Sequence, residues 1–429
     1  MRWLAPILPD MPGVTELDVA RLGRFEVTLG RLLARYPVDA DVPQGQRSVR
    51  LAQVRRDLAA FGQLADAVPA ADGGTGRAAV LQAPLQFVCG YHDIDLRDST
   101  GLGHGRLIAR HGSAPARARW LPLLLAGGLA GIAITEEHGG SQVHATTTTA
   151  TAHDGGYWTL TGTKTWISRL REAAVFIVFF ADPAGRLTAG AVDATADGLH
   201  RSAAVPAGLS GWAWGELRLE EVPLRPCDVL ARAGDGLDLL REHFAYYRPL
   251  VAATALGAAA YVHDRVARHL CARRQAGAII DLRDNALITV GSTHAQINAA
   301  LLAAFTAQRL ALAGDQRAEL WGCGAKAHGV DTAYAAVSEL ALLVGAAGFT
   351  AGSPLVKAVG DLAALRYADG IHDSLYRAAG RALTISATAP SMIPLRGPCR
   401  LASSRPPCLT DQGMKASAPS AGDFCGPTA

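Results

Sequence analysis

A block of β-prone sequence lies between two helical regions in this 429-residue chain, and any fold must accommodate that order. Residues 14–70 carry apolar side chains at helical spacing, and helical character returns at residues 78–87 and 107–125. After Gly128 the pattern changes to short β-prone runs between glycine turns. The clearest of these runs are residues 157–160, 175–180 and 217–220. From about residue 236 to 385, long Ala- and Leu-rich stretches predict a helical bundle.

This order predicts three domains and a tail. We expect an N-terminal α-helical domain over residues 1–125, a central β domain over residues 126–235 and a C-terminal helical bundle over residues 236–385. Residues 386–429 are rich in Pro, Ser, Gly and Cys without periodicity, so we expect a disordered tail. Within the β domain, Gly162 is expected to turn the chain.

Composition and charge argue against several classes of function. The formal net charge of +3 is too small for a strong nucleic-acid footprint. The seven cysteines include no Cys-x-x-Cys pair, so we expect buried free thiols and no metal site. The longest apolar run, residues 121–134, is shorter than a bilayer span, and the apolar N-terminus is too short for a secretion signal. We therefore expect a cytoplasmic protein with no nucleic-acid or membrane partner.

Five motifs follow one another between Gly112 and Gly257. Residues 134–141 read Ile-Thr-Glu-Glu-His-Gly-Gly-Ser, and residues 160–168 read Leu-Thr-Gly-Thr-Lys-Thr-Trp-Ile-Ser. The other three are Gly112 with Trp-Leu-Pro at 120–122, residues 208–223 ending in Val-Pro, and Arg248-Pro249 before Gly257. Together they resemble the acyl-CoA dehydrogenase family, whose two central signatures are Val-Thr-Glu-Pro-x-Ala-Gly-Ser and Leu-x-Gly-x-Lys-x-Trp-Ile-Thr/Ser.

The resemblance implies an α+β fold with an N-terminal α-helical domain, a central β-barrel-like domain and a C-terminal four-helix bundle. It also implies FAD as the cofactor. The residues that match the family's flavin-ring contacts are Ile134, Thr135, Trp166, Ile167 and Ser168. A flavin ring requires hydrogen-bonding groups at its edge and an aromatic wall, which these residue types supply. Trp166 would also suit an ordinary apolar core. Ser141 matches a serine that touches the bound thioester, although it would equally suit a turn.

The family's chemistry requires a carboxylate beside the substrate α-carbon, which abstracts a proton while the β-hydride passes to flavin N5. The matching stretch, residues 361–381, implies that Asp369 is this base and that Gly370 lies beside the substrate. A loop-capping role for Asp369 stays open. Aspartate is one methylene shorter than the usual glutamate, about 1.5 Å less reach. A misplacement of about 1 Å can cost on the order of a hundredfold in rate.

A second branch of the family keeps its base on the bundle helix, and the matching position here is Tyr247, which is no base. The adjacent Arg248 matches an arginine near the base. It could tune the charge state of Asp369, hold a substrate carboxylate, or form an inter-helix salt bridge.

The motifs that bind the FAD diphosphate are altered. Residues 273–277 read Arg-Arg-Gln-Ala-Gly and lack the Phe of the family's Arg-x-x-Phe-Gly. Residues 342–348 read Leu-Leu-Val-Gly-Ala-Ala-Gly and lack the Gln and one Gly of Gln-x-x-Gly-Gly-x-Gly. Arg273 and Gly345 remain as expected cofactor contacts. In the family these residues come from a neighbouring subunit, which implies a homodimer or homotetramer.

The resemblance predicts FAD-dependent α,β-dehydrogenation of an acyl thioester carried by CoA or an acyl carrier protein. An electron-transfer flavoprotein is a possible electron acceptor. Two alternatives stay open. Asp369 would also suit a flavin-dependent oxidase or monooxygenase on the same scaffold, and the altered diphosphate motifs would suit a catalytically silent structural subunit.

Overall fold

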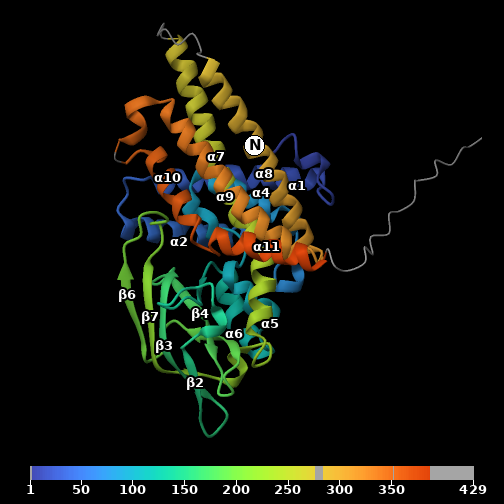
Figure 1. Cartoon of the computed structure of the whole chain (residues 1–429), viewed down its shortest axis with the longest axis vertical. Helices are drawn as coiled ribbons and strands as arrows, with labels where there is room; N and C mark the ends of the chain where they lie inside the picture. Colours follow the sequence, from blue (N-terminus) through green and yellow to red (C-terminus); the bar gives the residue numbers. More distant parts are fainter. Residues whose placement is uncertain (1, 276–283, 351, 387–429) are drawn as a thin grey trace, which may run out of the picture. The chain divides into compact units, whose positions relative to one another are not determined.

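The computed structural model in Figure 1 describes residues 2–275, 284–350 and 352–386. Helices come first, then strands, then helices, as the periodicity predicts. All but the first residue of the predicted tail lies outside the described residues. The strands fall between Leu129 and Leu230, within the segment predicted to be β.

The N-terminal region is helical, as predicted. Its helices are α1 (Glu16–Arg35), α2 (Gln44–Ala60), α3 (Gln63–Ala67), α4 (Gln82–His92), α5 (Arg106–His111) and α6 (Ala114–Leu125). Thr15 begins α1 with a capping box, in which its side chain and that of Asp18 satisfy each other's backbone N–H. The predicted single helix over residues 107–125 is instead two. The break occurs because the Ser113 hydroxyl caps α6 by accepting from the backbone N–H of Ala116 at 3.2 Å.

The central strands form one mixed sheet. They are β1 (Leu129–Ala133), β2 (Thr149–Ala152), β3 (Trp158–Ser168), β4 (Ala173–Ala181), β5 (Leu187–Asp193), β6 (Leu199–Ala204), β7 (Trp214–Leu224) and β8 (Val229–Leu230). Their order is β6-β7-β3-β2-β4-β5-β8, and β1 pairs in parallel with β4. Strand β4 is apolar on both faces because each face is covered. Val175, Ile177 and Phe179 pack with α5 and α6, whereas Phe176, Val178 and Phe180 pack with β3 and β7.

The predicted turn at Gly162 is wrong, because β3 runs continuously through this residue. Gly162 has a φ of 152° and lies at a register shift between β3 and β7. A Cβ at this position would lie 2.5 Å from Oγ1 and 2.6 Å from Cα of Thr148. The glycine therefore permits close approach of a neighbouring segment rather than a reversal of the chain.

Gly162→Ala is expected to destabilise the protein by about 1–3 kcal/mol, because the new methyl group meets the Thr148 backbone and the φ angle is strained. Chemical denaturation measures this difference. Gly155→Ala is the matched control, since Gly155 also has a positive φ of 89° but has open space around it. Equal destabilisation by both substitutions would show that the contact with Thr148 contributes nothing.

The C-terminal region is again helical. It contains α7 (Gly236–Gln275), α8 (Asp284–Leu312), α9 (Ala318–Leu342), α10 (Pro354–Leu365) and α11 (His372–Ser386). Figure 1 shows α7, α8 and α9 lying side by side. Helix α7 begins where the helical bundle was predicted to start, and it continues through Pro249. No helix of the described residues combines the length and the apolar character that a membrane span requires.

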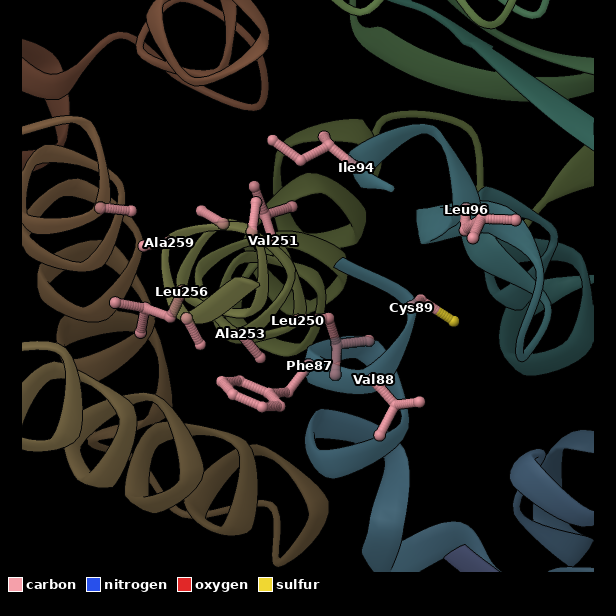
Figure 2. Close-up of a cluster of buried hydrophobic side chains, with 14 of the residues drawn as sticks. Phe87, Val88, Cys89, Ile94, Leu96, Leu250, Val251, Ala253, Leu256 and Ala259 are labelled. Carbon is pink, nitrogen blue, oxygen red and sulfur yellow. The ribbon is translucent and has the colours of Figure 1, made fainter. Parts of the chain in front are cut away.

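Helices α4 and α7 pack closely enough that their backbones nearly touch. A Cβ at Gly90 of α4 would lie 1.9 Å from the Thr254 carbonyl oxygen, and one at Gly257 of α7 would lie 2.1 Å from that of Phe87. Figure 2 shows the apolar side chains that surround this contact, including Leu250. The glycine at 257 therefore serves helix packing, and the contact fixes the part of α7 that carries Tyr247 and Arg248.

The described cysteines are free, as predicted. Cys89 and Cys323 are buried, but Cys271 is exposed, so the expectation of buried thiols is wrong for that residue.

Candidate active site

Trp166 projects from a bulge near the end of β3. The register between β3 and β7 shifts between Lys164 and Ile167, and Trp166 in the bulge has a φ of 58°. Its side chain is 65% exposed, whereas the neighbouring Ile167 is buried. An ordinary core role for Trp166 is therefore wrong for this chain. A large aromatic ring held at the surface by a strained bulge is typical of a ligand wall.

The segments that match the flavin-ring contacts lie side by side. The backbone N–H of Thr165 donates to the carbonyl of Thr135 at 2.8 Å, which joins β3 to the loop after β1. The Thr165 hydroxyl is buried and has no hydrogen-bond partner among the described residues. An exposed indole, an unpartnered hydroxyl and adjacent backbone groups fit the ring of a flavin, which takes both stacking and hydrogen bonds.

The loop from Ile134 to Ser141 is held by a buried ion pair. Lys164 of β3 donates to Oε1 of Glu136 at 2.7 Å and to the Ile134 carbonyl at 3.2 Å. The Glu136 carboxylate also accepts from the backbone or hydroxyl groups of residues 146–148. Burial opposes the charged form of Glu136, but hydrogen bonds from Lys164 and Thr146 outweigh it and lower its pKa. Glu136 belongs to the motif at residues 134–141, and Lys164 belongs to the motif at residues 160–168.

Asp369 and Gly370 form a turn between α10 and α11 in which both residues have positive φ angles, 57° and 107°. Two cationic side chains from the bundle hold successive carbonyl groups of this turn. Nε of Arg248 donates to the Asp369 carbonyl at 3.2 Å, and Nζ of Lys326 donates to the Gly370 carbonyl at 2.7 Å. A left-handed aspartate costs on the order of 1 kcal/mol, which these charge-assisted bonds offset.

Arg248 does not form the inter-helix salt bridge considered from the sequence. Within the described chain its guanidinium contacts the Asp369 carbonyl and Sγ of Cys323, at 3.2 Å in each case. It also lies over the ring of Phe244, 4.9 Å from the centroid. Arg248 therefore ties α7 to α9 and to the turn that carries Asp369.

Arg169, which no motif indicated, follows β3 directly and joins the end of this strand to Asp98 and to Tyr247 of α7. Its guanidinium is buried and pairs with Asp98 through two oxygens, at 2.7 and 2.6 Å. It donates to Ser168 at 2.6 Å and to the Tyr247 hydroxyl at 3.5 Å. Burial opposes the charge of Arg169, but the carboxylates of Asp98 and Asp369 outweigh it and raise its pKa. Burial also raises the pKa of Tyr247, which excludes Tyr247 as a ready base.

The loop carrying Ser141 reaches α11. The hydroxyl groups of Ser141 and Ser374 lie 3.2 Å apart. Ser141 ends the flavin-contact loop, and Ser374 lies in α11, which follows the Asp369 turn. Ser141 is exposed, so its hydroxyl is accessible to a ligand.

The two residues expected at the FAD diphosphate lie elsewhere. Arg273 is on the same helix as Arg248 but roughly 25 residues further along, about 37 Å at the helical rise of 1.5 Å per residue. Gly345 follows α9 with a φ of 66° and open space around it. Within one chain, Arg273 therefore lies far from the turn that Arg248 holds.

Comparison with known proteins agrees with this architecture. The model of the acyl-CoA dehydrogenase middle domain matches residues 131–222, and that of the C-terminal domain matches residues 234–384. A probable short/branched chain specific acyl-CoA dehydrogenase of Dictyostelium discoideum is 29% identical over 255 residues, which cover 58% of this chain. The chain spans 62% of the length of that relative.

Solved structures share the fold. A glutaryl-coenzyme A dehydrogenase in complex with glutaryl-CoA has a TM-score of 0.77 at 22% identity, covering 87% of this chain and 96% of its own. The prolyl acyl carrier protein oxidase AnaB has a TM-score of 0.76 at 19% identity, covering 86% and 99%. The helical, β and helical regions and the two matched domains show the fold of this family. The chain belongs to the acyl-CoA dehydrogenase family, whose cofactor is FAD.

Proposed function

We propose that this protein oxidises the α,β-bond of an acyl thioester, with Asp369 as the base that takes the α-proton. The observation that supports this most is the convergence of three elements. The exposed Trp166 lies in the bulge of β3, the buried Arg169 directly follows this strand, and Arg248 holds the Asp369 carbonyl. A base, an aromatic wall and fixed positive charge are the groups that proton abstraction beside a flavin requires.

In this proposal Thr135, Trp166, Ile167 and Ser168 hold the flavin ring. Arg273 and Gly345 of a second copy of the chain hold the diphosphate. FAD, when bound, supplies the acceptor for the hydride that leaves the β-carbon. Asp369 accepts the α-proton and holds it on its carboxylate. Arg248 and Lys326 keep the backbone of the Asp369 turn in place.

The proposed substrate is a thioester of CoA or of an acyl carrier protein, which enters near Ser141 and Gly370. The similarity of the fold to both a glutaryl-CoA dehydrogenase and a prolyl acyl carrier protein oxidase supports testing both carriers. An electron-transfer flavoprotein is the proposed acceptor for a dehydrogenase. The aspartate at the base position favours a second candidate, a flavin-dependent oxidase that passes its electrons to oxygen.

The test is the absorbance spectrum of the purified protein, recorded anaerobically before and after adding thioesters on each carrier. A flavin band that bleaches with one thioester supports the proposal and names the substrate class. Rapid recovery of the band with air supports the oxidase. A band that no thioester bleaches contradicts dehydrogenation of this class. Absence of a band after incubation with FAD favours a structural subunit that has lost the cofactor.

A further inference from the structure

Lys326 is a buried lysine whose ammonium group lies behind the proposed base. It belongs to α9, its residue exposure is 0%, and its Nζ donates to the Gly370 carbonyl at 2.7 Å. None of the recognised motifs includes it. A buried lysine without a full counter-charge is costly, so its retention beside a strained turn requires an explanation.

Charged groups from every neighbouring element face Lys326. The carboxylate of Asp369 in the turn favours its charged form, and Arg248 on α7 opposes that form. Asp331 on α9 also favours the charge, but its carboxylate pairs as well with Arg366, at 2.9 Å, and with His372 of α11, whose Nδ1 lies 3.0 Å away. Burial is the largest influence, and the sum lowers the pKa of Lys326 to about 7.

We propose that Lys326 is a positioning residue for Asp369: it holds the Asp369–Gly370 turn through the Gly370 carbonyl, and its charge is coupled to the charge of the Asp369 carboxylate. Only the catalytic consequence of this coupling rests on the proposed function of Asp369 as the base. When Asp369 takes a proton its negative charge disappears, and Lys326 then loses the group that favours its own charge. A neutral amine still donates to the Gly370 carbonyl, so the turn stays in place.

The first test needs no activity. It measures the melting temperature from pH 6 to pH 10 for the wild type, Lys326→Gln and Asp369→Asn. Because the pKa of Lys326 is lower in the folded chain than its ordinary value, the unfolded chain binds more protons between these two values. The cost of burying the charge is fully present below pH 7 and disappears as the pH rises. The wild type should therefore gain stability relative to Lys326→Gln from about pH 7 upward.

In Asp369→Asn the pH at which this gain in stability begins should be lower by about one unit or more, since the Asp369 carboxylate no longer favours the charged form of Lys326. An onset that does not move overturns the coupling. An identical pH dependence in the wild type and Lys326→Gln overturns the titration of Lys326 itself. If Lys326→Gln does not fold, the comparison of wild type with Asp369→Asn still decides the coupling.

The second test measures the rate of flavin bleaching against pH. The wild-type rate should rise through about pH 7, because the positive charge of Lys326 beside the proposed base is then absent. Lys326→Met should slow the reaction about tenfold to a hundredfold, and Lys326→Gln, which keeps a donor for the Gly370 carbonyl, should recover part of it. Neither variant should retain the inflection near pH 7.

The two tests separate the two claims. Bleaching in the wild type with an unchanged rate and pH profile in both lysine variants overturns the role of Lys326 and leaves the proposed function intact. No bleaching in the wild type, together with the expected stability shifts, overturns the proposed function and leaves the coupling of Lys326 to Asp369 intact.

Discussion

Asp369→Asn is expected to reduce the rate of thioester-driven flavin bleaching by about a hundredfold to ten-thousandfold, the usual contribution of a general base. The substitution preserves the size of the side chain and removes its negative charge and its ability to accept a proton. Asparagine also tolerates the left-handed backbone better than most residues, so the φ of 57° at this turn adds no new strain. Stopped-flow absorbance under anaerobic conditions measures the effect.

Asp373→Asn is the matched control, because Asp373 lies four residues away, is exposed, and undergoes the same change of charge. It should leave the bleaching rate unchanged. Flavin content and circular dichroism should match the wild type in both variants. A bleaching rate in Asp369→Asn close to that of the wild type would reject Asp369 as the base.

Asp369→Glu tests whether the shorter reach of the native aspartate limits the reaction. If the pocket is built for aspartate, the added methylene misplaces the carboxylate and slows the reaction. A faster reaction would instead indicate that the native aspartate is too short to place its carboxylate well.

Arg169→Met is expected to lower the free energy of unfolding by about 3–5 kcal/mol, because it removes the nearest cationic partner of the buried Asp98 carboxylate and leaves only Arg97, at 3.8 Å, as an ion-pair partner among the described residues. Side chains of both residues are only 2% exposed, and their closest atoms lie 2.5 Å apart. The same change removes a positive charge that interacts with Asp369 and a donor to Ser168. Urea denaturation measures the loss.

Two further variants distinguish the effect of breaking the buried ion pair from the effect of removing an exposed charge. Arg218→Met breaks the pair between Arg218 and Glu220, whose side chains are 55% and 51% exposed, and should cost less than about 1 kcal/mol. The double variant Arg169→Met with Asp98→Leu should be more stable than Arg169→Met alone, since the Asp98 carboxylate no longer stays buried without Arg169. Strictly additive losses would show that the two side chains do not interact.

Much of the architecture was predictable because it depends on local patterns. Helical and β-strand periodicity gave the order of the three regions, and the motif at residues 160–168 indicated Trp166, Ile167 and Ser168 as cofactor contacts. Local reasoning was wrong at Gly162, where a turn was predicted within a continuous strand. A glycine that reverses a chain and one that admits a neighbouring backbone look the same in sequence.

The candidate site depends on contacts that join distant parts of the chain, and only the tertiary structure decided them. Arg169 meets Asp98 across 71 residues, and Lys326 meets Gly370 across 44. A buried charge needs a partner, but it takes whichever group the packing of helices and strands brings within reach. The sequence by itself determined the family and the order of elements, and it indicated Asp369 as the proposed base. The partners that hold Asp369 in place were decided by packing, because side-chain pairing between separate elements carries no periodic signal.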